Sequence, residues 1–313
     1  MVVSLNLIRR MKGKYTTNLL LLHLIVLVWG LTGILGREIS LEPFLLVWWR
    51  VLIAVITIAI IAMVSRQPLV AGTRDLVRFA GVGLLTAAHW VCFFASIKYS
   101  KISVALVVLS TSAFFVSLIH PLLRREAPKR YEMGLGLVVI AGIFLIFEFE
   151  SEYWLGIILS LMAAFLAALF STLNARLVVN YRPTQMAFWE MLFAFLGVSV
   201  YLVITGEGRL SLSIAEGRMA LLPSYRDFKL LLLLGVLCTG VAFIVSIRVM
   251  RVLSPFTCAL AINMEPVYTI MLALLLYGSD EWMSPQFYVG GLVIISTLFI
   301  DTWLKQRQLK KSP

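Results

Sequence analysis

Charged residues are scarce in this chain. Asp, Glu, Lys and Arg make up 14% of its 313 residues, whereas 61% are hydrophobic. A soluble domain averages about 25% charged and about 45–50% apolar residues. The excess apolar side chains are more than one core needs, so they must face lipid. The net charge of +11 does not indicate a nucleic-acid-binding protein, because the basic residues lie in short stretches between long apolar runs.

Cysteine and histidine are also rare, with three of each. Cys92, Cys238 and Cys258 lie inside apolar runs, and their number and spacing match neither a disulfide framework nor a metal site. We interpret them as small packing residues, and we expect no cofactor or metal. The chain also lacks a His-Glu-x-x-His motif, which excludes that class of membrane metalloprotease.

The long apolar runs predict an all-α membrane protein with ten transmembrane helices, because a spanning helix needs about 20 apolar residues. The predicted spans are residues 18–36, 43–64, 76–97, 103–123, 132–149, 153–174, 184–204, 228–249, 254–277 and 285–304. A basic segment, residues 1–17, precedes them, and a basic tail, residues 305–313, follows them. The first run is interpreted as a retained span, because no small-residue cleavage site follows it.

The distribution of basic residues predicts that both ends of the chain lie in the cytoplasm. With the N-terminus inside, most of the 27 Lys and Arg residues fall on the cytoplasmic side of the ten spans. An odd number of spans would place one basic terminal cluster outside. We therefore expect a multi-pass protein of the cytoplasmic (inner) membrane.

A weak internal repeat divides the chain into two halves. Arg50 follows Pro43 at the same spacing as Glu190 follows Pro183, and each charged residue comes directly after a tryptophan. Five spans in a half is an odd number, so the second half must be inserted upside down, as in many transporters. The halves cover residues 18–149 and 153–304.

The order of several short motifs resembles the drug/metabolite transporter superfamily, EamA type. The motifs are Trp29-Gly30, Arg37, Pro43, Arg50 and residues 96–100 in the first half, and residues 251–255, Glu265-Pro266, Gly278, Glu281 and Gly290-Gly291 in the second. The resemblance implies a permease built from two inverted five-helix repeats. One departure is that Phe114-Phe115 stands in the first half where Pro266 stands in the second.

Three charged residues lie inside predicted spans, where each costs about 2.5–3.5 kcal/mol on insertion scales. Glu265 is about 16 Å from the end of its span, near the midplane, with Asn263 close by. We expect Glu265 to line the transport path, either binding a cationic group or titrating as a proton site. The alternative is a protonated carboxyl that joins two helices.

Arg50 and Glu190 occupy equivalent positions in the inverted halves. Each lies about 10 Å from its own membrane face, which leaves about 10 Å between them across a core of about 30 Å. We therefore expect them to flank a central cavity rather than pair, with Arg50 suited to a carboxylate and Glu190 to an ammonium group. Separate structural roles are the alternative.

Aromatic residues near these charges are candidates for the wall of the cavity. They are Trp49 and Trp189, which precede Arg50 and Glu190, and Trp90. His89 is a candidate proton relay. Each of them is equally consistent with ordinary helix packing.

The function predicted from these features is secondary transport of a small metabolite by alternating access. The resemblance implies export of amino acids or related zwitterionic compounds. The absence of a phosphate-binding loop and of a sizeable soluble domain favours a carrier over an ATP-driven pump, and no enzymatic activity is expected. The alternatives are an intramembrane serine-type hydrolase and a non-transporting scaffold or receptor. The expected partners are a solute and the lipid bilayer, and the sequence leaves open whether protons drive transport and whether the chain oligomerises.

Overall fold

The computed structural model describes residues 2–125, 130–206, 222–253, 258, 261–262 and 264–309. Every element in these ranges is helical. The elements of the first half are α1 (Val2–Glu38), α2 (Pro43–Val64), α3 (Thr73–Tyr99), α4 (Ile102–Leu109), α5 (Ser112–Arg124) and α6 (Arg130–Phe149). Those of the second half are η1 (Ser151–Tyr153), α7 (Trp154–Leu177), α8 (Pro183–Thr205), α9 (Tyr225–Leu232), η2 (Leu233–Val241), α10 (Ala242–Val249), α12 (Glu265–Tyr277), η3 (Gly278–Glu281) and α13 (Pro285–Leu309).

Seven helical segments of the described chain are long and apolar enough to cross a membrane, and a shorter apolar helix covers Gly134–Ile146. Helices also cover the predicted fifth and tenth spans, as α6 and α13, and the second part of the predicted ninth span, as α12. The all-helical membrane fold is thus confirmed, whereas the number of ten spans is not. Large apolar side chains such as Leu20, Met63 and Val203 are exposed along the helices, as contact with lipid requires.

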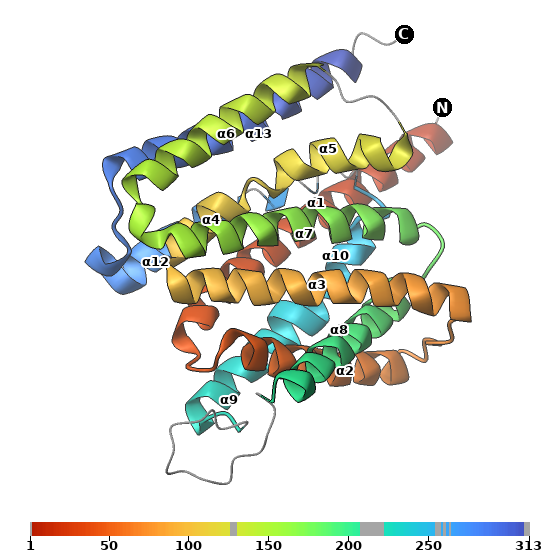
Figure 1. The fold of residues 1–313 in the computed structure, drawn as a ribbon. Coiled ribbons are helices and arrows are strands. Elements are labelled where there is room, and N and C mark those ends of the chain that lie inside the picture. Colours follow the sequence, from red (N-terminus) through yellow and green to blue (C-terminus); the bar gives the residue numbers. More distant parts are fainter. Residues whose placement is uncertain are drawn as a thin grey trace.

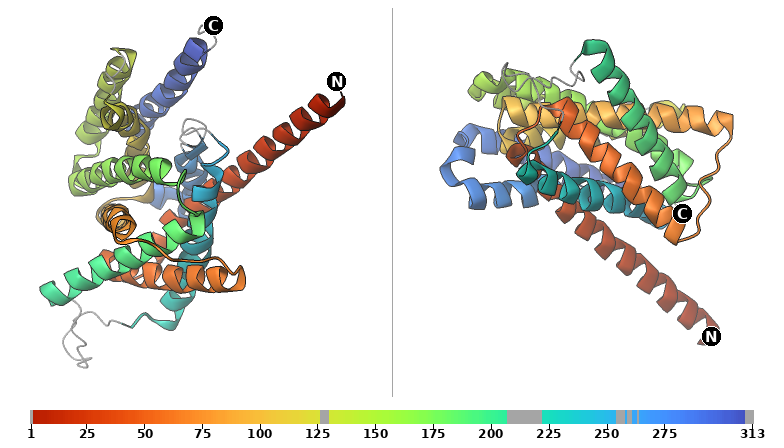
Figure 2. Two further views of the ribbon diagram at one scale, coloured as in Figure 1. Left: turned by 90° about the vertical axis from the view of Figure 1, so that its right-hand side faces the viewer. Right: turned by 90° about the horizontal axis from the view of Figure 1, so that it is seen from below.

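The helices form one bundle with a peripheral pair (Figure 1). α6 and α13 lie side by side along one edge, joined by the close approach of Gly142 and Gly290. A Cβ on either glycine would lie about 3.0–3.1 Å from the carbonyl oxygen of the other. The first part of α1 extends beyond the bundle as a single helix (Figure 2). It includes most of the basic segment 1–17, which is therefore helical.

The beginning of α1 and the end of α13 lie on the same side of the bundle, here called the terminal face (Figure 1). The connections α2–α3 and α7–α8 lie on this face. The connections α1–α2, α3–α4 and α12–α13 lie on the other side, here called the opposite face (Figure 1).

The two halves contact each other through equivalent acidic residues on the two faces. Asp75, in the first turn of α3, accepts a hydrogen bond from Tyr181 in the α7–α8 connection on the terminal face. Asp227, in the first turn of α9, accepts hydrogen bonds from the backbone nitrogen of Ser40 at 3.1 Å and from its hydroxyl at 2.5 Å. Ser40 belongs to the α1–α2 connection on the opposite face. Each half thus uses the start of its third spanning segment to hold the first connection of the other half.

Glu281 joins three elements on the opposite face. Its carboxylate is fully buried and accepts hydrogen bonds from the backbone nitrogen and hydroxyl of Ser103 at 3.1 and 3.0 Å. It also pairs with Arg37 at the end of α1, at 2.5 Å. A negative charge at the start of α4 satisfies unpaired N–H groups and interacts favourably with the helix dipole.

Replacing Glu281 with Ala should therefore lower the melting temperature of the purified protein. Loss of charge-assisted hydrogen bonds of this kind costs about 1.5–3 kcal/mol each. The matched control is Asp280→Asn, because Asp280 pairs with the same Arg37 at 3.6 Å but its side chain is 70% exposed. Thermal unfolding in detergent compares the two variants, and equal melting temperatures would contradict the capping role.

Candidate functional site

Two helices begin in the interior of the bundle, at equivalent positions of the two halves. α5 begins at Ser112, after a turn at Ser110 and Thr111 that interrupts the predicted span 103–123. The hydroxyls of Ser110 and Thr111 donate to the carbonyls of Val107 and Val108, at 2.5 and 2.7 Å. The Val108 oxygen also accepts from the backbone nitrogen of Thr111 at 3.1 Å, so both carbonyls have partners at the turn, as backbone at membrane depth requires.

The matching helix α12 begins at Glu265, with Pro266 in its first turn. Proline suits this position because its missing N–H would have no partner there. Ser112 and Glu265 both line a cavity between the halves. The positive ends of the two helices therefore point toward this cavity, an arrangement that favours polar or anionic groups at mid-membrane.

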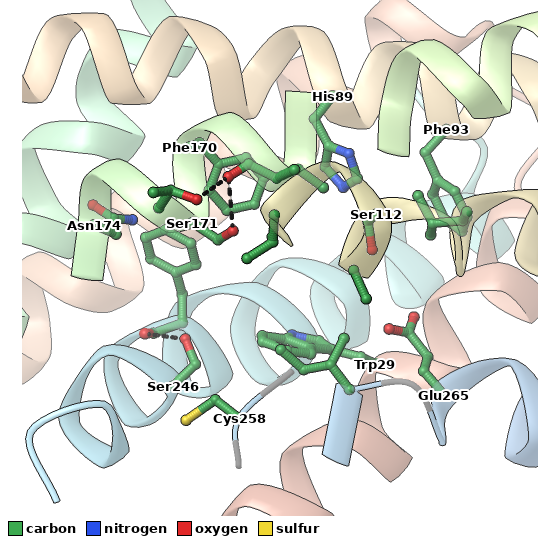
Figure 3. Close-up of a pocket in the computed structure, with 18 of the residues that line it drawn as sticks. Trp29, His89, Phe93, Ser112, Phe170, Ser171, Asn174, Ser246, Cys258 and Glu265 are labelled. Atoms are coloured by element: carbon green, nitrogen blue, oxygen red, sulfur yellow. Dashed lines mark hydrogen bonds between the residues drawn. The ribbon is translucent and has the colours of Figure 1, made fainter. Parts of the chain in front are cut away.

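The cavity has a volume of about 230 Å³ and is lined by both halves. Its aromatic residues are Trp29, Trp90, Phe93, Phe170 and Phe243, and its charged or strongly polar residues include Arg50, His89, His120, Asn174 and Glu265. In Figure 3 the carboxylate of Glu265 and the ring of His89 extend into the same space from different helices. The cavity thus combines apolar walls with a few polar groups, as small-molecule sites do.

Arg50 is 2% exposed and is held by groups from both halves. Its Nε donates to the Thr239 hydroxyl at 2.7 Å, and its guanidinium lies 4.0 Å from the centre of the Trp90 ring. The Nη1 atom has no hydrogen-bond partner in the structure. Arg50 is one of the residues that line the cavity, and this buried Nη1 is a donor that its protein contacts leave unused.

Arg50 belongs to α2, but the segment that provides its hydrogen-bond acceptor, Thr239, is a π-helix, η2. The Thr239 hydroxyl, which accepts from Arg50, donates to the carbonyl of Leu234 at 2.8 Å. Gly235 lets α2 approach closely, since a Cβ there would lie 2.6 Å from Ile53 and 3.1 Å from the Arg50 carbonyl oxygen. π-helical segments are rare and frequently mark functional sites, and this one positions the acceptor for a buried arginine.

Glu265 lines the same cavity and interacts electrostatically with Arg50. The two side chains do not form an ion pair within 4 Å, to judge from the contacts among the described residues. Arg50 and Glu265 therefore present opposite charges to one cavity without neutralising each other through direct contact.

His89 is 9% exposed, and its Nδ1 lies 2.8 Å from the carbonyl oxygen of Ala163. Nδ1 must be the donor in this bond, so Nε2 is the acceptor of the neutral ring. Of the residues predicted from the sequence, Arg50, His89, Trp90 and Glu265 line the cavity.

Three other predicted residues do not line it. Glu190 is fully buried against Asn174, with 3.0 Å between the Asn174 nitrogen and a carboxylate oxygen. Trp49 packs edge-on against Trp48, and the Trp189 nitrogen donates to the carbonyl of Leu69 at 2.6 Å. Asn263 lies outside the described residues.

Sequence reasoning missed several residues of the cavity. Asn174, Ser112 and His120 line it, but none was singled out, because a lone polar residue in an apolar span carries no indication of its direction. Trp29 was noted only through the family resemblance. The equivalence of Phe114 with Pro266 was the available signal for an interrupted helix, since it aligned the starts of α5 and α12.

Comparison with known proteins decides the family. The model of the EamA-like transporter family matches the chain twice, over residues 16–148 and 154–302. The chain belongs to the EamA-like transporter family. The two matches coincide with the two halves found in the sequence, so this EamA-like protein has the two-repeat architecture of a multi-pass membrane transporter of small molecules.

Individual relatives agree with this assignment. The chain is 25% identical over 305 residues to a protein of Archaeoglobus fulgidus described as an uncharacterized transporter, with 92% of this chain and 98% of that protein covered. A protein of known crystal structure shares the fold with a TM-score of 0.63 at 16% identity, covering 94% of this chain and 99% of that one.

The contact between Arg50 and Thr239 can be tested by removing one hydroxyl. Thr239→Val keeps the shape of the side chain but removes the acceptor for Arg50, so we expect solute affinity to fall by about tenfold or more, as for a charge-assisted bond. Thr239→Ser retains the hydroxyl and is the control. Equal solute affinities for the two variants, measured on purified protein, would show that this bond does not position Arg50.

Proposed function

We propose that this transporter carries a zwitterion, an amino acid or a related compound, by alternating access. The observation that supports the proposal is that Arg50 and Glu265 line one cavity without pairing directly. Nη1 of Arg50 is buried and has no hydrogen-bond partner, so the carboxylate of such a solute would satisfy it on reaching it. The carboxylate of Glu265 suits the ammonium group of the solute. Binding both groups would satisfy two charges that are costly to keep unpaired inside a membrane.

The size and walls of the cavity suit the same class of solute. Its volume of about 230 Å³ lies just below the range of about 300–1,000 Å³ for pockets that bind drug-sized ligands, which suits a compound as small as an amino acid. Trp90, Phe93 and Phe243 provide a surface for an apolar side chain. Ser112 and the positive end of α5 add polar contacts near the midplane.

We further propose that the protein lies in the cytoplasmic (inner) membrane and that its terminal face is on the cytoplasmic side. The proposal follows from the basic residues near both ends of the chain. Export is the direction that the family resemblance implies, and we propose that an opposing flow of protons drives it.

Purified protein in lipid vesicles tests the transport proposal directly. Vesicles loaded with radiolabelled amino acids should exchange them with external solute, and protein-free vesicles should not. Competition should require both charged groups of the solute. The amide and the N-acetyl derivative of an amino acid, which each lack one charge, should compete more weakly than the parent compound. Equal competition by an apolar cation without a carboxylate would contradict the role of Arg50.

Replacing Glu265 with Gln should weaken binding of the zwitterion. The loss of one charge-assisted hydrogen bond, about 1.5–3 kcal/mol, corresponds to about a tenfold to hundredfold increase in KM. Glu148→Gln is the matched control, because Glu148 is exposed on α6 and does not line the cavity. Transport by the Glu265→Gln variant with an unchanged KM would rule out Glu265 as the ammonium ligand.

A further inference from the structure

Glu190 lies on α8 at a close contact between α8 and α3. A Cβ on Gly83 of α3 would lie 2.2 Å from the backbone oxygen of Glu190. No side chain separates the two helices at this point, and the Glu190 side chain is fully buried. Its carboxyl group is therefore sealed from lipid, from solvent and from the cavity.

Asn174 on α7 is the polar partner of Glu190. Its Nδ2 donates to Oε2 of Glu190 at 3.0 Å. The other oxygen of Glu190, Oε1, and the amide oxygen of Asn174, Oδ1, are both buried and have no hydrogen-bond partner. Two buried acceptors without donors are unfavourable, at about 1–3 kcal/mol each, and here they belong to two groups that already share one bond.

Among the residues that the structure describes, no cation pairs with Glu190 to compensate a negative charge on it. On the helices packed against α8, Arg50 of α2 bonds to Thr239, His89 of α3 donates to a carbonyl, and Arg248 of α10 is exposed. Asp75 and Arg78 of α3 pair with each other at the terminal face. A sealed carboxylate with one neutral hydrogen bond is costly, and such groups bind a proton instead.

We propose that Glu190 and Asn174 form a proton-binding site. A proton on Oε1 of Glu190 makes that atom a hydrogen-bond donor. Its acceptor is Oδ1 of Asn174, the other unpaired oxygen of the two side chains. The acid and the amide then form two antiparallel hydrogen bonds, and one proton satisfies both unpaired atoms.

The site is connected to the cavity through Asn174, which lines the cavity and is 2% exposed. Movement of Asn174 breaks the paired arrangement and leaves the acid without an acceptor. The O–H bond of Glu190 then breaks, and its proton passes to water that enters the opened cavity. The role of this site in transport, as the site of the coupling proton, rests on the proposed function. The presence of the proton on Glu190 does not.

Infrared spectroscopy tests the proton without any solute. The protein in lipid at neutral pH should show the C=O stretching band of a protonated carboxyl that is absent from Glu190→Gln. Glu265→Gln is the control and should retain that band. If the wild type and Glu190→Gln have the same carboxyl spectrum at every pH from acid to neutral, Glu190 is ionised and the proposal is wrong.

Transport measurements test the coupling. In Glu190→Gln the amide can form the same two bonds with Asn174, so the variant should fold with a melting temperature near that of the wild type. Glu190→Leu leaves Asn174 unpaired and should melt lower. We expect Glu190→Gln to exchange solute without responding to an imposed pH gradient, whereas the wild type accumulates solute when the gradient is applied. Gradient-driven accumulation by Glu190→Gln would exclude Glu190 as the coupling site.

The two kinds of failure are distinguishable. If no zwitterion is exchanged by the wild type, the proposed function fails, while the infrared band still reports the proton on Glu190. If exchange occurs and the band is absent, the transporter proposal stands and the proton site fails.

Discussion

Arg50 is a full charge at the centre of an apolar bundle, and much of the architecture around it serves to hold that charge. Its Nε is bonded to Thr239 in the other half and its plane lies against Trp90. Gly235 permits the close approach of α2 that brings Thr239 within reach. These contacts use only part of the guanidinium and leave its buried Nη1 without a hydrogen-bond partner. The halves are therefore joined by the same residue that gives the cavity its positive charge.

The interrupted helices supply the complementary polarity. A continuous apolar helix presents no unpaired backbone groups to a solute, whereas the starts of α5 and α12 bring backbone dipoles to mid-membrane. The cost of interruption is offset locally, by the hydroxyls of Ser110 and Thr111 in one half and by Pro266 in the other. The two halves thus reach a similar backbone geometry by different chemical means, and only the second half adds a carboxylate, Glu265.

Hydropathy and charge distribution were sufficient to predict the helical class, most span positions and the two-half organisation, because lipid imposes strong constraints on length and polarity. They also singled out Glu265 and Arg50 as charges inside predicted spans, and both residues line the cavity. Depth does not fix rotation about a helix axis, and this is why Glu190, predicted beside the cavity, lies behind Asn174 instead. The interruption before Ser112 was not predicted, since no proline marks it. Long-range contacts such as Glu281 with Ser103 depend on how loops from distant parts of the chain meet, which no local pattern records.

The reciprocal contacts of Asp75 with Tyr181 and of Asp227 with Ser40 have a consequence for the resting state of a carrier. Both contacts are present together in this structure, each joining the halves at one face, to the same plan in inverted orientation. Opening of a face, as the proposed alternating access requires, would break the contact on that face. Which face is open at rest is then set by the difference between two similar free energies, not by the strength of either contact. A small difference of this kind is easily shifted by a single substitution or by the voltage across the membrane, so closely related chains can rest in opposite orientations while keeping an identical cavity.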